Sequence, residues 1–457
     1  MPTFSGKFQY QNPDGTPLGG GSCRLSFEKE SFTLTPTSGA PIAFDLGDIE
    51  IFTPADYELT LTLYTGQRIV LSQFAKTFQN LSHDLLQAYR QRLVQCLLLE
   101  DLEEVSRFEG MVQLRSQVAG CSFASPAELR LYKSNLAVLP TQATGLQWRL
   151  AEIDSVEFDD ATYAVSIRAG EETLVVTKLA KRTGEFRQRL EEGIAEITEK
   201  AAQATHELLP FLNPDQFQLV AQLLKEGHAV SVPRLKTIHP KTETALVENI
   251  VDAKLRPYFD ALLARVPTGI YTGFKFIRKG EEDSEEPEAG TPETSEVAGE
   301  SAPADQQPPD EEAVEGASEE KEPIQHWFFF PLATRPGAPR PGNLVAWEAT
   351  SRGGRATYFF RLVPPEQAPQ LEDSTCAGAL VDTAIRQLNR ALVLLNFRRE
   401  PIYLSDEKLE LQPRYRRYAI ACRKLPELRR LRTSFLGRAI HTSPEAWLKQ
   451  AESFLNP

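Results

Sequence analysis

The chain has 457 residues, of which 41% are hydrophobic and 25% charged, and its formal net charge is −13. These fractions are typical of globular proteins, and the length corresponds to about three domains, so a fibrous or fully disordered chain is excluded. No stretch reaches the ~18 consecutive apolar residues that cross a bilayer, and the first residues lack the basic and apolar parts of a secretory signal, so we expect a cytoplasmic protein.

The first hundred residues predict a series of short strands followed by one helix. Apolar and polar residues alternate in seven segments that turn residues separate, which is the pattern of half-buried strands. Leucines and a tyrosine at helical spacing then predict a helix from about Phe78 to Asp101. The predicted strands are Gly6–Gln11, Arg24–Glu28, Phe32–Thr35, Ile42–Leu46, Glu50–Phe52, Glu58–Tyr64 and Arg68–Ser72.

The same series occurs a second time. Residues 44–49 (FDLGDI) resemble residues 148–153 (WRLAEI), and a tyrosine-bearing alternating segment, a glycine turn and a further strand follow in both places. Each series ends with an apolar residue, Ala and Lys before a helix, which in the second copy spans about Gly184 to Leu209. Because the spacing stays near 105 residues throughout, we interpret the first two hundred residues as a duplication.

Six or seven antiparallel strands closed by one C-terminal helix form the plan of the pleckstrin-homology-like (PH-like) fold, which both copies resemble across residues 1–205. The resemblance implies two small antiparallel barrels or sandwiches, each with a C-terminal helix, that recognise inositol phosphates, peptides or proteins. Members that bind inositol phosphates carry a basic cluster on the first hairpin, because several phosphates need several cations. Only Lys7 and Arg24 flank that hairpin in the first copy, and the second copy offers Arg115, Arg130 and Lys133. We therefore expect protein or peptide binding and no phosphoinositide binding.

From His206 onward the pattern changes to helices. Asn213-Pro214-Asp215 supplies an N-cap, a proline at the first helical position and an acid in the first turn. A second helix is expected from about Pro240, and Pro257 should kink or end it. Four alternating segments then predict an antiparallel sheet, after which a long helix over about Ala377 to Phe397 and three shorter helices are expected. The predicted strands are Thr268–Ile277, Ile324–Ala333, Asn343–Thr350 and Ala356–Val363.

Aromatic residues crowd these last strands. Consecutive strand residues point to opposite faces, so both faces of the sheet carry aromatic side chains. We expect the flanking amphipathic helices to cover them.

An acidic segment interrupts this region. Between Glu281 and Glu322 the chain has 17 acidic residues, one lysine and no aromatic residue. Such a composition cannot bury enough apolar surface to fold, so a disordered insertion is expected between two strands. It is either a solubilising loop or a regulator that shields the basic segment near the C-terminus.

The predicted fold class is therefore a multidomain α+β protein. Residues 1–104 and 105–205 form the two PH-like domains, and residues 206–277 plus 324–457 form a C-terminal α+β domain. Residues 278–323 form the disordered acidic insertion in that domain.

Motifs that carry chemistry are absent from the sequence. It contains no P-loop, GxGxxG, GxSxG or HExxH pattern, and its six histidines stand singly. The five cysteines are scattered and form no CxxC pair, which argues against a disulfide framework and a structural zinc site. We therefore predict no catalytic residues, no metal site and no cofactor.

One segment has a composition that points to binding. Residues 412–438 hold nine basic residues and one acid, and Pro426 divides the segment into two helices. Tyr415, Tyr418 and Cys422 share an apolar face of the first helix, which leaves the arginines on the opposite side as a positive ridge. This ridge is either an ordinary solvated surface or an anion-binding surface. The candidate anion-binding residues are Arg414, Arg416, Arg417, Arg423, Lys424, Arg429, Arg430 and Arg432.

These observations predict a non-enzymatic interaction or scaffold protein that binds a protein or peptide through its PH-like modules. One alternative is a protein that binds nucleic acid or another polyanion through the arginine-rich helices, with the acidic insertion as regulator. The other is an enzyme with an unrecognised site in the C-terminal domain. The identity of the partner stays open.

Overall fold

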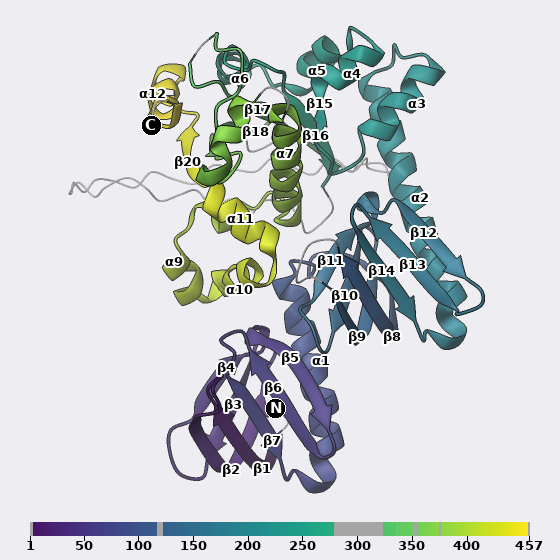
Figure 1. Ribbon diagram of the computed structural model, residues 1–457, viewed down its shortest axis with the longest axis vertical. Helices are drawn as coiled ribbons and strands as arrows, with labels where there is room; N and C mark the ends of the chain where they lie inside the picture. Colours follow the sequence, from purple (N-terminus) through teal and green to yellow (C-terminus); the bar gives the residue numbers. More distant parts are fainter. Residues whose placement is uncertain are drawn as a thin grey trace, which may run out of the picture.

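The computed structural model describes residues 3–116, 122–277, 323–335, 337–350, 355–373 and 376–455. Three antiparallel sheets and a set of helices form a mixed α+β protein, as the sequence predicted (Figure 1). The predicted acidic insertion lies outside the described residues except for Pro323. The boundaries of the predicted domains stay predictions.

The first sheet contains seven strands in the order β4-β3-β2-β1-β7-β6-β5. Helix α1 (Phe78–Cys96) follows the last of these strands and buries one apolar side, on which Leu81, Leu85 and Tyr89 have no exposed surface. The strands are β1 (Thr3–Gln11), β2 (Pro17–Phe27), β3 (Ser31–Pro36), β4 (Ile42–Asp45), β5 (Ile49–Ala55), β6 (Glu58–Leu63) and β7 (Arg68–Ser72). Each predicted strand of the first copy is present.

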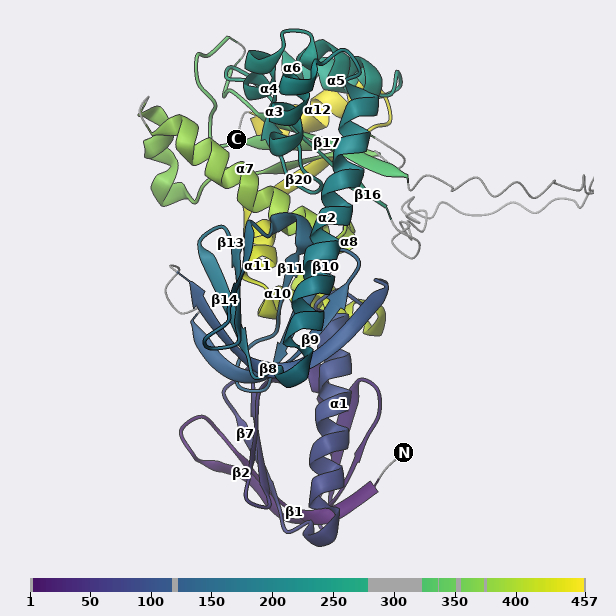
Figure 2. The ribbon, with the colours of Figure 1, turned by 90° about the vertical axis from the view of Figure 1, so that its right-hand side faces the viewer.

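The second sheet repeats this arrangement in the order β11-β10-β9-β8-β14-β13-β12. Its helix is α2 (Thr183–Leu208), which extends beyond the sheet towards the third region (Figure 2). The strands are β8 (Glu104–Ser116), β9 (Phe123–Tyr132), β10 (Asn135–Pro140), β11 (Leu146–Arg149), β12 (Ser155–Asp159), β13 (Ala164–Ala169) and β14 (Glu172–Thr177).

The backbone of the two copies matches in detail. Tyr57 and Tyr163 occupy equivalent turns and have φ angles of 57° and 51°. Gln73 and Lys178, one turn before each helix, both have a φ of 59°. Left-handed backbone is uncommon for residues other than glycine, so its recurrence at equivalent positions supports the duplication.

The third sheet has six strands in the order β15-β16-β17-β18-β19-β20. The four predicted strands form its centre, and the sequence missed both edge strands. No strand was predicted for residues 435–440, and Phe435 was assigned to the second arginine-rich helix, yet these residues pair with β19, with Gly437 opposite Phe359. The strands are β15 (Val230–Ser231), β16 (Tyr271–Phe276), β17 (Ile324–Pro331), β18 (Val345–Ala349), β19 (Ala356–Phe360) and β20 (Phe435–Ile440).

Helices cover both faces of the third sheet, as expected. On one face Trp327 donates a hydrogen bond from Nε1 to Oδ1 of Asn389 in α7 (Ala377–Leu394), at 3.0 Å. On the other face Phe328 and Phe330 each meet Phe259 of α6 (Arg256–Leu263) edge-on, and α12 (Pro444–Leu455) packs beside them. Aromatic side chains therefore fill a core on each side of this sheet.

The remaining helices connect these layers. The helix predicted from Pro240 is divided into two, because α5 ends at Ile250 and α6 begins at Arg256, with Pro257 in its first turn. The others are α3 (Pro214–Leu223), α4 (Val232–Ile238), α5 (Thr242–Ile250), α8 (Glu400–Tyr403), α9 (Asp406–Leu411), α10 (Arg416–Lys424) and α11 (Pro426–Ser434). Two short 3₁₀ helices, η1 (Leu46–Asp48) and η3 (Leu150–Glu152), occupy equivalent places in the two repeats.

Candidate functional site

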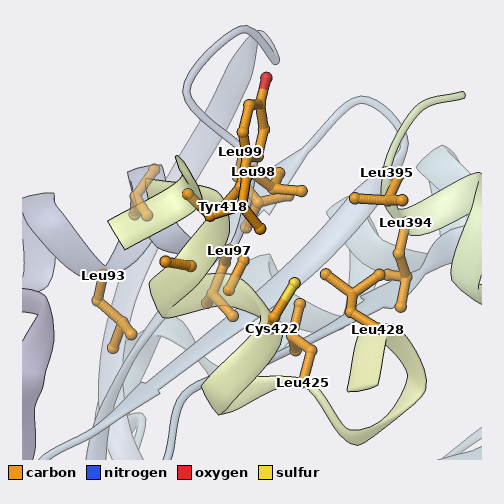
Figure 3. Close-up of a cluster of buried hydrophobic side chains, with 14 of the residues drawn as sticks. Leu93, Leu97, Leu98, Leu99, Leu394, Leu395, Tyr418, Cys422, Leu425 and Leu428 are labelled. Carbon is orange, nitrogen blue, oxygen red and sulfur yellow. The ribbon is translucent and has the colours of Figure 1, made fainter. Parts of the chain in front are cut away.

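Helix α10, which holds several of the predicted anion-binding residues, packs on the first repeat. Figure 3 shows its side chains Tyr418 and Cys422 among leucines from the end of α1 and the segment after it. Ile420 has no exposed surface and lies over η1. Gly47 in η1 makes this approach feasible, because a Cβ atom there would lie 2.8 Å from Cδ1 of Ile420. We call this packing of α10 on α1 and η1 the α10 contact.

Acidic residues at the start and end of η1 form ion pairs with cationic side chains of α10. Asp45 caps η1 by accepting a 2.7 Å hydrogen bond from the backbone N–H of Gly47. Asp48 accepts hydrogen bonds from Nη2 of Arg423 at 2.5 Å and from Nη2 of Arg416 at 3.2 Å. Burial raises the pKa of Asp48, and these two guanidinium groups oppose the rise. The pairs therefore offset part of the cost of burying this carboxylate.

Lys424 is buried inside the α10 contact. Its side chain is buried, and Nζ donates a 2.9 Å hydrogen bond to the backbone carbonyl of Ile49. Burial lowers the pKa of this amine. Lys424 is thus bound internally and does not lie on an open surface.

The sequence predicted an open positive ridge, but several of its arginines contact other groups of this chain. Arg417 pairs with Glu100, and Arg432 donates to the carbonyl of Leu404 and to Asp406, at 2.8 and 2.6 Å. The guanidinium of Arg414 lies 4.5 Å from the ring centre of Tyr415. Most of these cations contact this chain because acids far away in sequence lie opposite them. Anion binding by the whole ridge stays a prediction, and Arg414, Arg429 and Arg430 are its exposed members.

The thiols in the α10 contact lead to a prediction. Burial raises the pKa of Cys96 to about 12 and that of Cys422 to about 11. Since the thiolate is the reactive form, we expect both to resist a thiol reagent at pH 8 in the native protein, whereas the exposed Cys376 reacts quickly. Mass spectrometry of labelled peptides from a Cys121→Ser variant measures this. Labelling of Cys422 at the rate of Cys376 would contradict the buried contact.

A pocket of about 340 Å³ lies beside Arg430, between α7 and α11. The segment after β19 forms its third wall and is held by a 2.8 Å hydrogen bond from the N–H of Arg361 to the carbonyl of Ser434. We call it the α7–α11 pocket. Its lining residues are Arg361, Leu362, Val363, Pro364, Pro365, Gln367, Leu380, Thr383, Ala384, Gln387, Arg430, Thr433 and Ser434.

The ionisable groups that line this pocket are all positively charged. Its ionisable lining residues are Arg361 and Arg430, both exposed, while Leu362, Val363 and Ala384 give it an apolar floor. Within the part of the chain that the structure describes, neither guanidinium group has an ion pair or a hydrogen-bond partner. The pocket can therefore hold an anionic group next to an apolar one.

Sequence reasoning identified Arg430 and missed Arg361. Arg361 was assigned to the end of a strand, and the structure places it just after β19, where Pro364 and Pro365 turn the chain. The two arginines are far apart in sequence and line the same pocket because α7 packs on α11 and the Arg361 N–H donates to the Ser434 carbonyl. No local sequence pattern predicts that Arg361 and Arg430 line the same pocket.

The described residues hold neither a metal-binding cluster nor a membrane-spanning helix. Among them, no group of three or more His, Cys, Asp and Glu side chains lies close enough together to hold a metal ion. Within the same ranges, no helix has the length and apolar character needed to cross a bilayer.

Comparisons with known proteins give little information on this chain. No protein-family model matches the sequence, and no curated protein matches it. One similar solved structure is the N-terminally truncated linker-DH/PH domains of p115-RhoGEF, with 14% identity and a TM-score of 0.17, over 26% of this chain and 45% of that one. Another is a DUF3598-family protein of unknown function from Nostoc punctiforme, with 12% identity and a TM-score of 0.14, over 40% of this chain and 80% of that one. Neither similarity supports an assignment.

Proposed function

We propose that the chain is a non-enzymatic interaction protein, built on two PH-like modules, that binds an acidic peptide segment of a partner in the α7–α11 pocket. The plan of seven antiparallel strands and one closing helix in each repeat supports the PH-like modules. In the first repeat, α10 already occupies the surface of α1 and η1. The first repeat therefore acts as a scaffold. The partner binds in the α7–α11 pocket.

The observation that carries the proposal is a pair of guanidinium groups that have no partner among the described residues and that line one pocket with buried apolar side chains. Charge-assisted hydrogen bonds from arginine to carboxylate are among the strong polar contacts in proteins. The floor of Leu362 and Val363 buries an apolar side chain next to the acid, and the glutamine, threonine and serine side chains of the lining offer hydrogen bonds to a peptide backbone.

The lining favours a peptide over the two alternative functions. A nucleic acid binds through a row of cations along its backbone, and most arginines of the ridge contact acids of this chain. The hydroxyl groups of Thr383, Thr433 and Ser434 would need an adjacent base to act as nucleophiles in an enzyme, and the lining of this pocket contains no Asp, Glu, His or Cys.

Charge reversal of the pocket tests the proposal. We expect Arg361→Glu and Arg430→Glu each to weaken binding of peptides that contain a Glu-Glu-Leu or Glu-Glu-Phe segment at least tenfold, because a hydrogen bond to a charged group contributes about 1.5–3 kcal/mol. Fluorescence anisotropy with a labelled peptide set measures this, and the same peptides with Gln in place of Glu should bind weakly to the unmodified protein.

Arg429→Glu is the matched control, since Arg429 is exposed on the same helix and does not line the pocket. Equal binding of the Glu and Gln peptides, or an equal loss with Arg429→Glu, would contradict recognition in the pocket.

A further inference from the structure

A second pocket, of about 490 Å³, lies in the second repeat between η3, α2 and α3. Apolar side chains from all three elements line it, and polar groups gather at the end of α3. We call it the α2–α3 pocket. Its lining residues are Leu150, Ala151, Ile153, Ile194, Ile197, Thr198, Ala201, Ala202, Phe217, Gln218, Ala221, Gln222, Lys225 and Glu226.

The duplication identifies this pocket as the counterpart of the α10 contact. Residues of η3 follow those of η1 by 104 positions, and residues of α2 follow those of α1 by 105. In the first repeat, α10 fills the space over η1 and α1, with Ile420 fully buried against Gly47. In the second repeat, α3 packs on α2 in a comparable role, but a cavity remains between α3 and η3.

Smaller side chains in the second repeat create this cavity. Ile194 stands where the first repeat has Tyr89, and Ala202 stands where it has Leu97. Both Tyr89 and Leu97 are completely buried in the first repeat. The second repeat thus leaves apolar surface uncovered at positions that the first repeat fills, and such surface gains from contact with an apolar ligand.

The polar end of the pocket carries an uncompensated positive charge. Glu226 is buried, and its carboxylate is neutralised by Arg149, with Nη2 and Oε1 2.9 Å apart. Lys225 is half-buried beside it, and among the described residues its ammonium group has no ion pair or hydrogen-bond partner. An anionic group at this end would therefore gain a cation that is partly shielded from water.

We propose that the α2–α3 pocket binds an acyl carboxylate, with the hydrocarbon chain against Ile194 and Ile197 and the carboxylate at Lys225. The volume suits a small molecule and excludes a complete helix, which is about 10–12 Å wide with its side chains, because α3 already occupies the outer side. This binding function is separate from peptide recognition in the α7–α11 pocket.

Titration of the full chain with sodium oleate below its micelle concentration tests the proposal. Isothermal calorimetry and native mass spectrometry should show saturable binding of one oleate, with a Kd on the order of micromolar. Oleyl alcohol, which has the same chain without the charge, should bind at least tenfold more weakly. Equal binding of oleate and oleyl alcohol would overturn the role of Lys225.

Two variants restore the bulk of the first repeat. Ala202→Leu places the residue of the first repeat in the pocket, and Thr198→Leu does the same one turn earlier. Each should abolish oleate binding while circular dichroism and the melting temperature show a folded protein, and the second variant serves if the first does not fold. Unchanged oleate binding in a folded variant would overturn the proposed location.

Lys225→Gln should weaken oleate binding about tenfold and leave binding of oleyl alcohol unchanged. Lys200→Gln, on α2 and outside the lining, is the matched control and should have no effect. Co-sedimentation with phosphatidylcholine vesicles, with and without oleate, separates a free acid from a lipid surface. Binding to vesicles that contain no oleate, unaffected by Ala202→Leu, would overturn the proposal in favour of a surface contact.

Discussion

Replacing Ile420 by alanine is expected to lower the free energy of unfolding by about 2–5 kcal/mol, the range for removing a large aliphatic side chain from a core. Ile420 is fully buried against Gly47 of η1, although it belongs to a helix far along the chain. The substitution leaves a cavity in the α10 contact and weakens the attachment of the first repeat. Urea unfolding followed by tryptophan fluorescence measures the change.

Ile440→Ala is the control for this prediction. Ile440 is 38% exposed at the edge of the third sheet, so its loss should change the free energy of unfolding by no more than about 0.5 kcal/mol. A loss of similar size for both variants would contradict the packing of α10 on the first repeat.

The second large effect is expected at the Arg149–Glu226 pair. Both side chains are almost completely buried, with Nη2 and Oε1 2.9 Å apart. Arg149→Met removes the guanidinium group that faces the buried Glu226 carboxylate, and breaking a buried pair in this way costs about 3–5 kcal/mol. Thermal and urea unfolding measure the loss.

The double variant Arg149→Met, Glu226→Leu should recover most of that stability, because replacing a buried pair by apolar residues of similar volume is often neutral. A double-mutant cycle with Glu226→Leu alone gives the coupling free energy of the pair. A double variant as unstable as Arg149→Met would show that the loss comes from packing and not from an isolated charge.

The duplication could be predicted because its signals are local. The alternation of apolar residues, the glycine turns and the spacing near 105 residues are visible in the chain, and the seven strands and one helix of each copy follow from them. The edge strand β20 was missed because its six residues follow a helix without a clear stop signal. It forms only through pairing with β19.

The ion-pair partners of the arginines in α10 could not be predicted in the same way. Arg423 meets Asp48 across 375 positions of sequence, and nothing near either residue indicates the other. One signal was available, however. Asp48 of η1 has an acidic equivalent in η3, Glu152, whereas Asp45 has none, because Arg149 stands at its position. A difference between otherwise matching repeats marks a place where one copy has a contact of its own.

The α10 contact has a consequence for synthesis of the protein. The ribosome synthesises the first repeat long before α10. Leu93, Leu97 and Leu98 therefore stay uncovered by α10 while more than three hundred further residues are added to the chain. Apolar surface left open for that time favours aggregation of the nascent chain. The first repeat should therefore depend on chaperones until α10 has been synthesised and packs on these leucines.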